Sequence, residues 1–132
     1  MISGGPQPAG AAAFRPDPSG FIWLDQDGVV QFFAPDVDPI QARVLAVVQQ
    51  PISAAAFLGK EPFGPPAWAS FPSWFLISAQ DRMIPPAAQH FMTERTGGTI
   101  SSIDGSRCSL ISHADVVAAL VQTAAQALAS QS

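Results

Sequence analysis

The strongest constraint on the fold lies after Pro72, where apolar runs alternate with helical patterns. The run Trp74-Phe75-Leu76-Ile77 is typical of a strand that is buried on both faces. Pro86 can open a helix that Gly97-Gly98 ends, and residues 99–103 then predict a second strand. Because strands that alternate with helices pair in parallel through right-handed crossovers, this region predicts an α/β fold.

The last predicted helix has the most regular pattern in the chain. Ser112 and Asp115 have the spacing of a capping box, which predicts that the helix begins there. The apolar residues that follow share one helical face: Val116, Val117, Leu120, Val121, Ala124 and Leu128. Two parallel strands alone leave both sheet edges unpaired, so we expect self-association or a partner chain to cover an edge.

Proline content separates the rest of the chain from this unit. Eleven of the thirteen prolines precede Ser73. Residues 1–20 show no periodicity, which predicts a flexible N-terminal segment of loop or disorder. Residues 21–71 combine short helical patterns with aromatic residues, and residues 72–132 contain the strand-helix-strand-helix unit. We therefore divide the chain into these three segments.

Local signals within the middle segment predict a hairpin and two helices. The apolar runs 21–24 and 29–33 flank Asp27-Gly28, a turn signal, and predict a β-hairpin. Asp38 can cap a helix before Pro51, and Ser53 can cap a shorter one over residues 54–58. The apolar face predicted for the first of these helices consists of Ile40, Val44, Val47 and Val48.

Length and composition point to one apolar domain. The chain has 132 residues, of which 48% are hydrophobic and 12% charged, with a mean hydropathy of +0.23. A net charge of −4 with few Lys and Arg residues argues against nucleic-acid binding. The apolar runs are too short to span a membrane, the N-terminus lacks the pattern of a secretion signal, and Cys108 has no cysteine partner. We therefore expect a soluble, cytoplasmic protein without a disulfide.

The segment from Pro72 to Pro86 resembles the late strand and acid-bearing turn of α/β-hydrolases of the small esterase and hydroxynitrile-lyase type. The resemblance implies that Asp81 occupies the position of the catalytic acid. The helix, strand and loop that follow continue the match, and the family's catalytic histidine lies in that loop. Arg107 stands at the histidine position. The resemblance therefore predicts a partial α/β-hydrolase fold, of which residues 72–132 are the C-terminal part.

The region before Pro72 is similar to the mainly helical cap that this family inserts between the two halves of its sheet. Caps of this kind line an acyl or aromatic pocket. The aromatic residues that the resemblance offers as pocket candidates are Trp23, Phe32, Phe33, Phe57 and Trp68. Core packing is the alternative role for these side chains.

Two departures from the family pattern concern the catalytic chemistry. Arginine stays protonated at ordinary pH, so Arg107 cannot act as a general base, although it could pair with Asp81. The sequence also has no G-x-S-x-G motif, in which the family's nucleophile serine lies. We therefore expect a truncated or degenerate esterase-like hydrolase that is inactive alone.

Two other functions remain open at the level of sequence. In the first, the chain is a non-catalytic module that binds an apolar ester or an aryl or acyl acid, with Arg107 holding the carboxylate. In the second, a partner chain supplies the missing strands and the serine. No cofactor is predicted, and no metal site, because neither His90 nor His113 has a second ligand at suitable spacing.

The remaining titratable candidates have simpler interpretations. His113 is the imidazole nearest the missing base, but its place beside the predicted cap Ser112 favours a surface or capping role. His90 is expected to face solvent. Cys108 next to Arg107 invites a reactive-thiol interpretation, whereas the apolar residues after it favour a buried structural thiol.

Overall fold

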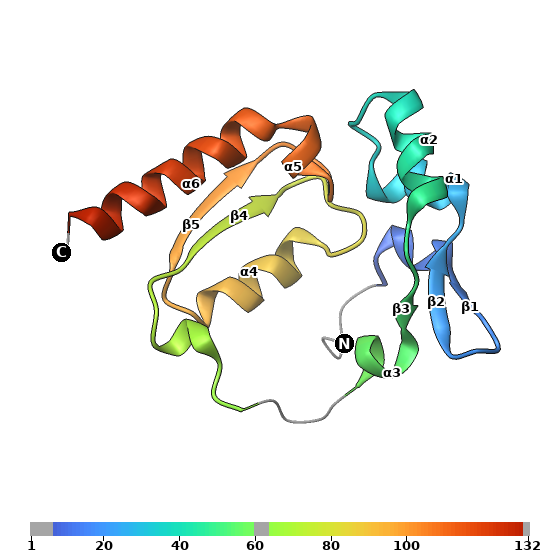
Figure 1. Ribbon diagram of the computed structural model, residues 1–132, viewed down its shortest axis with the longest axis horizontal. Coiled ribbons are helices and arrows are strands. Elements are labelled where there is room, and N and C mark those ends of the chain that lie inside the picture. Colours follow the sequence, from blue (N-terminus) through green and yellow to red (C-terminus); the bar gives the residue numbers. More distant parts are fainter. Residues whose placement is uncertain (1–6, 60–63, 131–132) are drawn as a thin grey trace.

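The computed structural model describes residues 7–59 and 64–130. It contains two parts, an N-terminal part built on short strands and helices, and a C-terminal part in which a strand pair runs between two helices (Figure 1). In chain order the elements are η1 Ala9–Ala13, β1 Phe14–Pro16, β2 Phe21–Leu24, α1 Gln26–Gly28, η2 Val29–Phe33, α2 Pro39–Val48, β3 Ile52–Ser53, α3 Ala54–Leu58, η3 Ala67–Ala69, β4 Trp74–Ser78, α4 Pro86–Glu94, β5 Thr99–Ile103, α5 Ser109–Ser112 and α6 Ala114–Ala129.

The C-terminal part confirms the predicted strand-helix-strand-helix unit. Strands β4 and β5 pair in parallel, from Trp74 opposite Thr99 to Ser78 opposite Ile103. Helices α4 and α6 flank this pair (Figure 1). Gly97 follows α4 with a positive φ of 64°, the left-handed conformation that glycine adopts without steric cost. The α/β fold class is therefore confirmed.

An antiparallel sheet forms the N-terminal part, in the order β1-β2-β3. Asp17 shapes the turn between the first two strands, because its carboxylate accepts hydrogen bonds from the amides of Ser19 and Phe21. Gly20 completes this turn with a φ of 85°. The prediction of loop or disorder is therefore wrong for residues 9–16, and residues 1–6 lie outside the described residues.

The predicted hairpin between residues 21–24 and 29–33 is wrong. Residues 29–33 form the π-helix η2, and β2 pairs with β1 and β3 instead. Asp25 explains the difference, because its side chain accepts a hydrogen bond from the amide of Gly28 and so caps α1. The Asp-Gly signal lies inside a helical start rather than in a turn between strands.

Helix α2 begins as predicted but buries another face. The Asp38 carboxylate accepts hydrogen bonds from the amides of Ile40 and Gln41, at 3.0 and 3.1 Å. Ala42 and Ala46 are the buried positions of the helix, since small side chains let its backbone approach η2 closely. The residues predicted to face the core are exposed instead: Ile40, Val44, Val47 and Val48.

Of the other two predicted helix caps, one is present in the structure and one is not. Ser53 caps α3, since its hydroxyl accepts a hydrogen bond from the amide of Ala56 at 3.4 Å. The capping box at Ser112 and Asp115 is wrong. His113 is the N-cap residue of α6 and makes no side-chain cap bond, while the Ser112 hydroxyl donates to Asp36 and to the carbonyl of Cys108.

One cluster of buried residues joins the N-terminal and C-terminal parts. It consists of Ala34, Val37, Ala42 and Cys108, with Val30, Phe33, Leu45 and Ile111 packed against them. The amide of Gly10 also donates to the carbonyl of Arg82, at 2.9 Å. A Cβ at Gly10 would lie 3.0 Å from the backbone carbonyl oxygen of Arg82, so this close approach favours glycine. The cluster thus connects the N-terminal part to the segment after β5, and the hydrogen bond connects it to the turn after β4.

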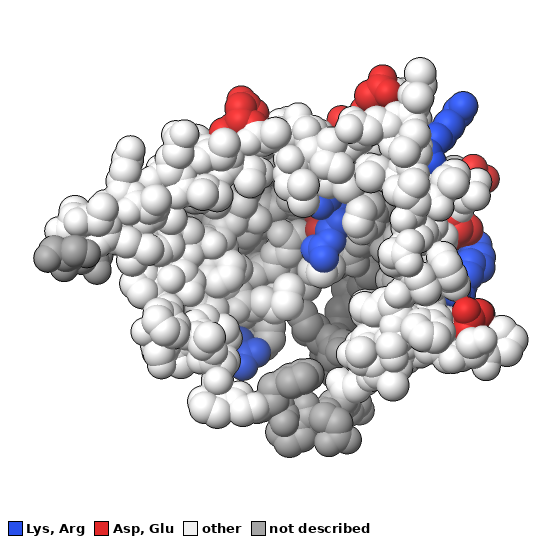
Figure 2. All heavy atoms as spheres, viewed as in Figure 1, with Lys and Arg blue, Asp and Glu red and all other residues white. Residues whose placement is uncertain are grey.

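Charged groups are sparse on the face drawn in Figure 2, where they gather mainly over the N-terminal part. Large apolar side chains are exposed on several elements, among them Phe91 and Met92 on α4 and Val121 on α6. Among the residues that the structure describes, no helix is both long enough and apolar enough to cross a membrane.

Candidate functional site

Asp81 lies directly after β4, and its side chain is 1% exposed. One carboxylate oxygen, Oδ1, accepts hydrogen bonds from the backbone amides of Met83 at 2.8 Å and Ile84 at 2.9 Å. An aspartate that binds amides two and three residues further on closes a tight turn. The turn fixes the backbone around this carboxylate and leaves its second oxygen to face other side chains.

The second oxygen of Asp81 faces Arg107. Arg107 Nη1 lies 3.6 Å from Asp81 Oδ2, and the arginine side chain is 41% exposed. The two residues meet because each follows one of two adjacent parallel strands, whose carboxyl ends lie at the same edge of the sheet. The structure therefore brings together the two residues that the resemblance places at the acid and histidine positions.

Gln89 is a third member of this site, and no pattern in the sequence predicts it. Its Nε2 lies 3.1 Å from Asp81 Oδ2 and 2.8 Å from the carbonyl of Ile84. The same side chain also accepts from the amide of Ser78 at 3.1 Å. Gln89 lies in the first turn of α4, eight residues after Asp81, so only the fold brings the two together.

A second polar cluster links the loop after β5 to the N-terminal part. Asp36 accepts hydrogen bonds from the Ser106 amide at 2.8 Å, from the Ser106 hydroxyl, and from the Ser112 hydroxyl at 2.9 Å. His113 Nε2 lies 3.7 Å from the same carboxylate. Asp36 was also missed in the sequence, because its partners are at least 70 residues away along the chain.

The pKa of Asp36 reflects two opposing effects. Burial raises the pKa of this carboxyl group, but the hydrogen bonds from the Ser106 hydroxyl, the Ser106 amide and the Ser112 hydroxyl lower it more, so the pKa lies below its usual value. Asp36 is therefore a charged anchor for the loop that carries Arg107.

Buried serines lie near this loop but face each other. The hydroxyl oxygens of Ser78 and Ser109 are 2.7 Å apart, and the Ser109 hydroxyl donates to the carbonyl of Ser106 at 2.7 Å. Within residues 7–59 and 64–130, neither hydroxyl makes a hydrogen bond with an imidazole or with Asp81. Their observed bonds are structural, since they connect the end of β4 to α5.

The remaining sulfur and imidazole groups match the simpler interpretations. Cys108 is buried, and burial together with the nearby charge of Asp36 raises the pKa of its thiol to about 11. The thiol therefore stays protonated at neutral pH, which fits a structural role. His90 is exposed on α4. In the described part of the chain, no three His, Cys, Asp or Glu side chains form a group that could hold a metal ion.

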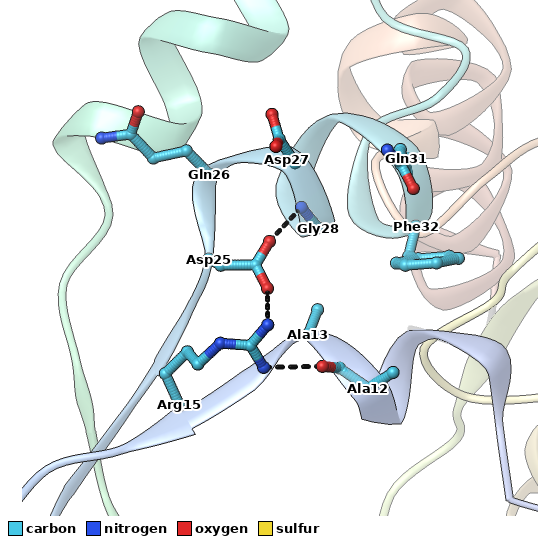
Figure 3. A pocket seen from close by; sticks show the side chains of 9 residues that line it. All are labelled: Ala12, Ala13, Arg15, Asp25, Gln26, Asp27, Gly28, Gln31 and Phe32. Carbon is cyan, nitrogen blue, oxygen red and sulfur yellow. Dashed lines mark hydrogen bonds and ion pairs between the residues drawn. The ribbon is translucent and has the colours of Figure 1, made fainter.

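One of the aromatic pocket candidates lines a pocket. Phe32 borders a cavity of about 480 Å³ together with residues of η1, β1 and α1 (Figure 3). Arg15 and Asp25 form an ion pair in this pocket, and Arg15 also donates to the carbonyl of Ala12 at 2.6 Å. The pocket is polar and lies on the N-terminal part, apart from Asp81 and Arg107, neither of which lines it.

The other four aromatic candidates do not gather around that pocket. The Trp23 indole donates to Asp17 at 3.1 Å, and the Phe57 ring packs against Phe14 with ring centroids 5.5 Å apart. Phe33 packs against the core, and Trp68 lies in η3 and is partly exposed. The structure therefore gives these side chains separate packing environments.

The fold and site define a class of protein. Two parallel strands carry a buried carboxylate and a facing side chain on adjacent carboxyl ends, which is the arrangement of the last strands of a hydrolase-type sheet. The family model described as "Alpha/beta hydrolase family" matches residues 2–120. The chain belongs to the α/β-hydrolase family, as the resemblance predicted.

Two solved structures have the same fold over most of this chain. A crystal structure of polyneuridine aldehyde esterase has a TM-score of 0.67 to this chain at 13% sequence identity, over 84% of this chain and 47% of the esterase chain. A crystal structure of a mutant of that esterase gives a TM-score of 0.66 at 14% identity, over 83% and 46%. The chain thus spans about half the length of these structures. A comparison with curated protein sequences found no match.

Proposed function

We propose that this chain is an esterase-like α/β-hydrolase without hydrolytic activity of its own, in which an ion pair replaces the acid–histidine pair. The observation that supports the proposal is the 3.6 Å contact between Asp81 Oδ2 and Arg107 Nη1. Asp81, which stands at the acid position, is buried and is paired with Arg107, whose guanidinium does not titrate at ordinary pH.

The chemistry of ester hydrolysis explains why this pair matters. A triad needs an imidazole that takes a proton from a serine hydroxyl and later returns it to the leaving group. A guanidinium is always protonated and only donates hydrogen bonds, so Arg107 cannot perform either step. The contacts of Asp81 within the described residues are to Arg107, Gln89 and two backbone amides, which also makes its role structural.

Hydrolysis of p-nitrophenyl acetate tests this proposal. The purified chain should release nitrophenol at the same rate as an Asp81→Asn variant and as the heat-denatured chain. A higher rate in the native chain that is lost in Asp81→Asn would contradict the proposal, because it would show that the carboxylate works in catalysis.

A second candidate function is binding of a carboxylate ligand at Arg107. In the described residues the only ion pair or hydrogen bond of the arginine side chain is with Asp81, so most of its five N–H donors have no protein acceptor. A guanidinium that is 41% exposed and has free donors can bind a carboxylate in a bidentate manner. The ligands with this chemistry are aryl and acyl acids.

Calorimetric titration with benzoate and with octanoate tests this second function. Binding that weakens in Arg107→Gln but not in Arg43→Gln would support it. Arg43 serves as the control because it lies on α2, in the N-terminal part. Absence of heat with both acids, or equal affinity in Arg107→Gln, would rule it out.

A further inference from the structure

Gln89 makes more hydrogen bonds to the acid site than its place in a helix requires. Its Oε1 accepts from the amide of Ser78 at 3.1 Å. Its Nε2 faces three acceptors, which are the carbonyl of Ile84 at 2.8 Å, Asp81 Oδ2 at 3.1 Å and the carbonyl of Ser78 at 3.4 Å. One amide thus connects the last residue of β4, the carboxylate and the end of the Asp81 turn.

Helix geometry explains why Gln89 reaches this place. Side chains in an α-helix lean toward its N-terminus. Gln89 is the fourth residue of α4, so its amide extends back over the turn of residues 81–84 that precedes the helix. A glutamine side chain is suited to this position because it carries an acceptor for the Ser78 amide and donors for the carboxylate.

We infer that Gln89 is a positioning residue, which holds the Asp81 carboxylate so that its Oδ2 faces the side chain at position 107, whether that side chain is an arginine or an imidazole. Asp81 Oδ1 is already fixed by two backbone amides. The Gln89 amide supplies the remaining restraint, because it binds the same oxygen that faces Arg107. Without it, the carboxylate keeps its turn but is less restrained about its last torsion angle.

The opposing view is that Gln89 only covers the outer edge of β4. The Thr99 amide donates to the carbonyl of Ser73, and the Ala79 amide donates to the carbonyl of Ile103, so the backbone polar groups of the odd-numbered residues face β5. The polar groups of Ser78 therefore face away from β5, where Gln89 binds them. The two roles differ in one respect, since only positioning predicts an effect on a side chain at position 107.

An imidazole introduced by Arg107→His reports directly on the carboxylate. The charged and titratable groups on this loop or next to it include Asp81, Asp36, Asp104, His113 and the Cys108 thiol. An opposite charge at close range raises an imidazole pKa by about one unit or more above its usual value of about 6.5. We expect this rise in NMR pH titrations of Arg107→His, and we expect it to disappear when Asp81→Asn is added.

The decisive comparison adds Gln89→Leu to Arg107→His. Positioning predicts that about half or more of the rise in imidazole pKa is lost, whereas the control Gln122→Leu, on the exposed surface of α6, leaves it unchanged. The same imidazole pKa with and without Gln89→Leu, in variants with native near-ultraviolet circular dichroism, would overturn the inference.

A second variant covers the case in which Gln89→Leu does not fold. Gln89→Asn keeps an amide at this position but shortens the side chain by one methylene, which draws its amide nitrogen away from Asp81 Oδ2. Loss of about half or more of the rise in imidazole pKa when Gln89→Asn is added to Arg107→His supports positioning. An unchanged imidazole pKa overturns it. Neither readout involves ester hydrolysis, so failure of this inference and failure of the proposed lack of activity are distinguishable.

Discussion

A buried carboxylate must be satisfied by its neighbours, and Asp81 satisfies this requirement with four separate donors. Two are backbone amides from its own turn, one is an amide from α4 and one is a guanidinium from the loop after β5. The ion pair is therefore part of a hydrogen-bonded network, in which loss of the carboxylate leaves several donors without an acceptor.

Removal of this carboxylate should cost stability. We expect Asp81→Ala to lower the free energy of unfolding by about 2–4 kcal/mol, because it leaves buried amides and Gln89 unsatisfied. Urea unfolding followed by tryptophan fluorescence measures this change. Glu94→Ala, at an exposed position of α4, serves as the control and should change the free energy by less than about 0.5 kcal/mol.

Asp36 should make stability depend on acid pH. Its pKa is lower in the folded chain than the ordinary value of 3.8, so its contribution is present above that value and is lost as the pH falls through the folded pKa. We expect unfolding free energy to decline below about pH 4, and to decline less steeply in Asp36→Asn. Identical pH profiles for the two proteins would contradict this assignment.

At the scale of single residues, the sequence is informative where the order of the strands decides which side chains lie close together. The resemblance leaves open that Arg107 pairs with Asp81, and the structure has this ion pair because the two residues follow adjacent parallel strands. Gln89 and Asp36 were missed because their roles depend on how a helix and a distant loop approach the site. No local pattern distinguishes them from other polar residues.

At the scale of elements, the segments predicted correctly are those with strong local signals. Strands β4 and β5 and helix α4 have apolar runs or a clear start and stop, and each lies where expected. The apolar run of residues 29–33 predicts a strand where the π-helix η2 lies, because so short a run has no period that separates strand from helix. The cap at Asp25 favours the helical conformation. Tertiary packing through Ala42 and Ala46 likewise decided which face of α2 is buried.

The cap of α2 provides a test at this scale. Asp38→Ala should destabilise the chain by about 1 kcal/mol, because two amides of the first turn lose their acceptor. Asp38→Asn keeps an acceptor oxygen and should lose much less. Thermal unfolding by circular dichroism compares the two variants, and equal melting temperatures for Asp38→Ala and Asp38→Asn would contradict a capping role.

The molecule as a whole has little charge and much exposed apolar surface. Val44 and Val47 on α2 are 53% and 69% exposed, and they border a shallow apolar hollow with Ile40 and Val48. The β4-β5 sheet also has only two strands, whereas a parallel sheet normally has more strands between its helix layers. Exposed apolar faces of this kind favour association.

We expect this surface to cause self-association at raised protein concentration. Light scattering should show a molar mass above 13.8 kDa that increases with concentration. The substitution Val47→Glu should shift the mass toward that of the monomer, whereas Gln41→Glu, which adds the same charge at an exposed position of α2, should have little effect. A constant monomer mass at all concentrations would exclude association through this helix.

The central claim is that Asp81 interacts with Arg107, and a double-mutant cycle tests it most directly. The unfolding free energies of the natural chain, Asp81→Asn, Arg107→Gln and the double variant yield the coupling energy between the two side chains. Because Arg107 is 41% exposed, we predict a favourable coupling of about 0.5–1 kcal/mol. A coupling energy of zero would contradict the claim.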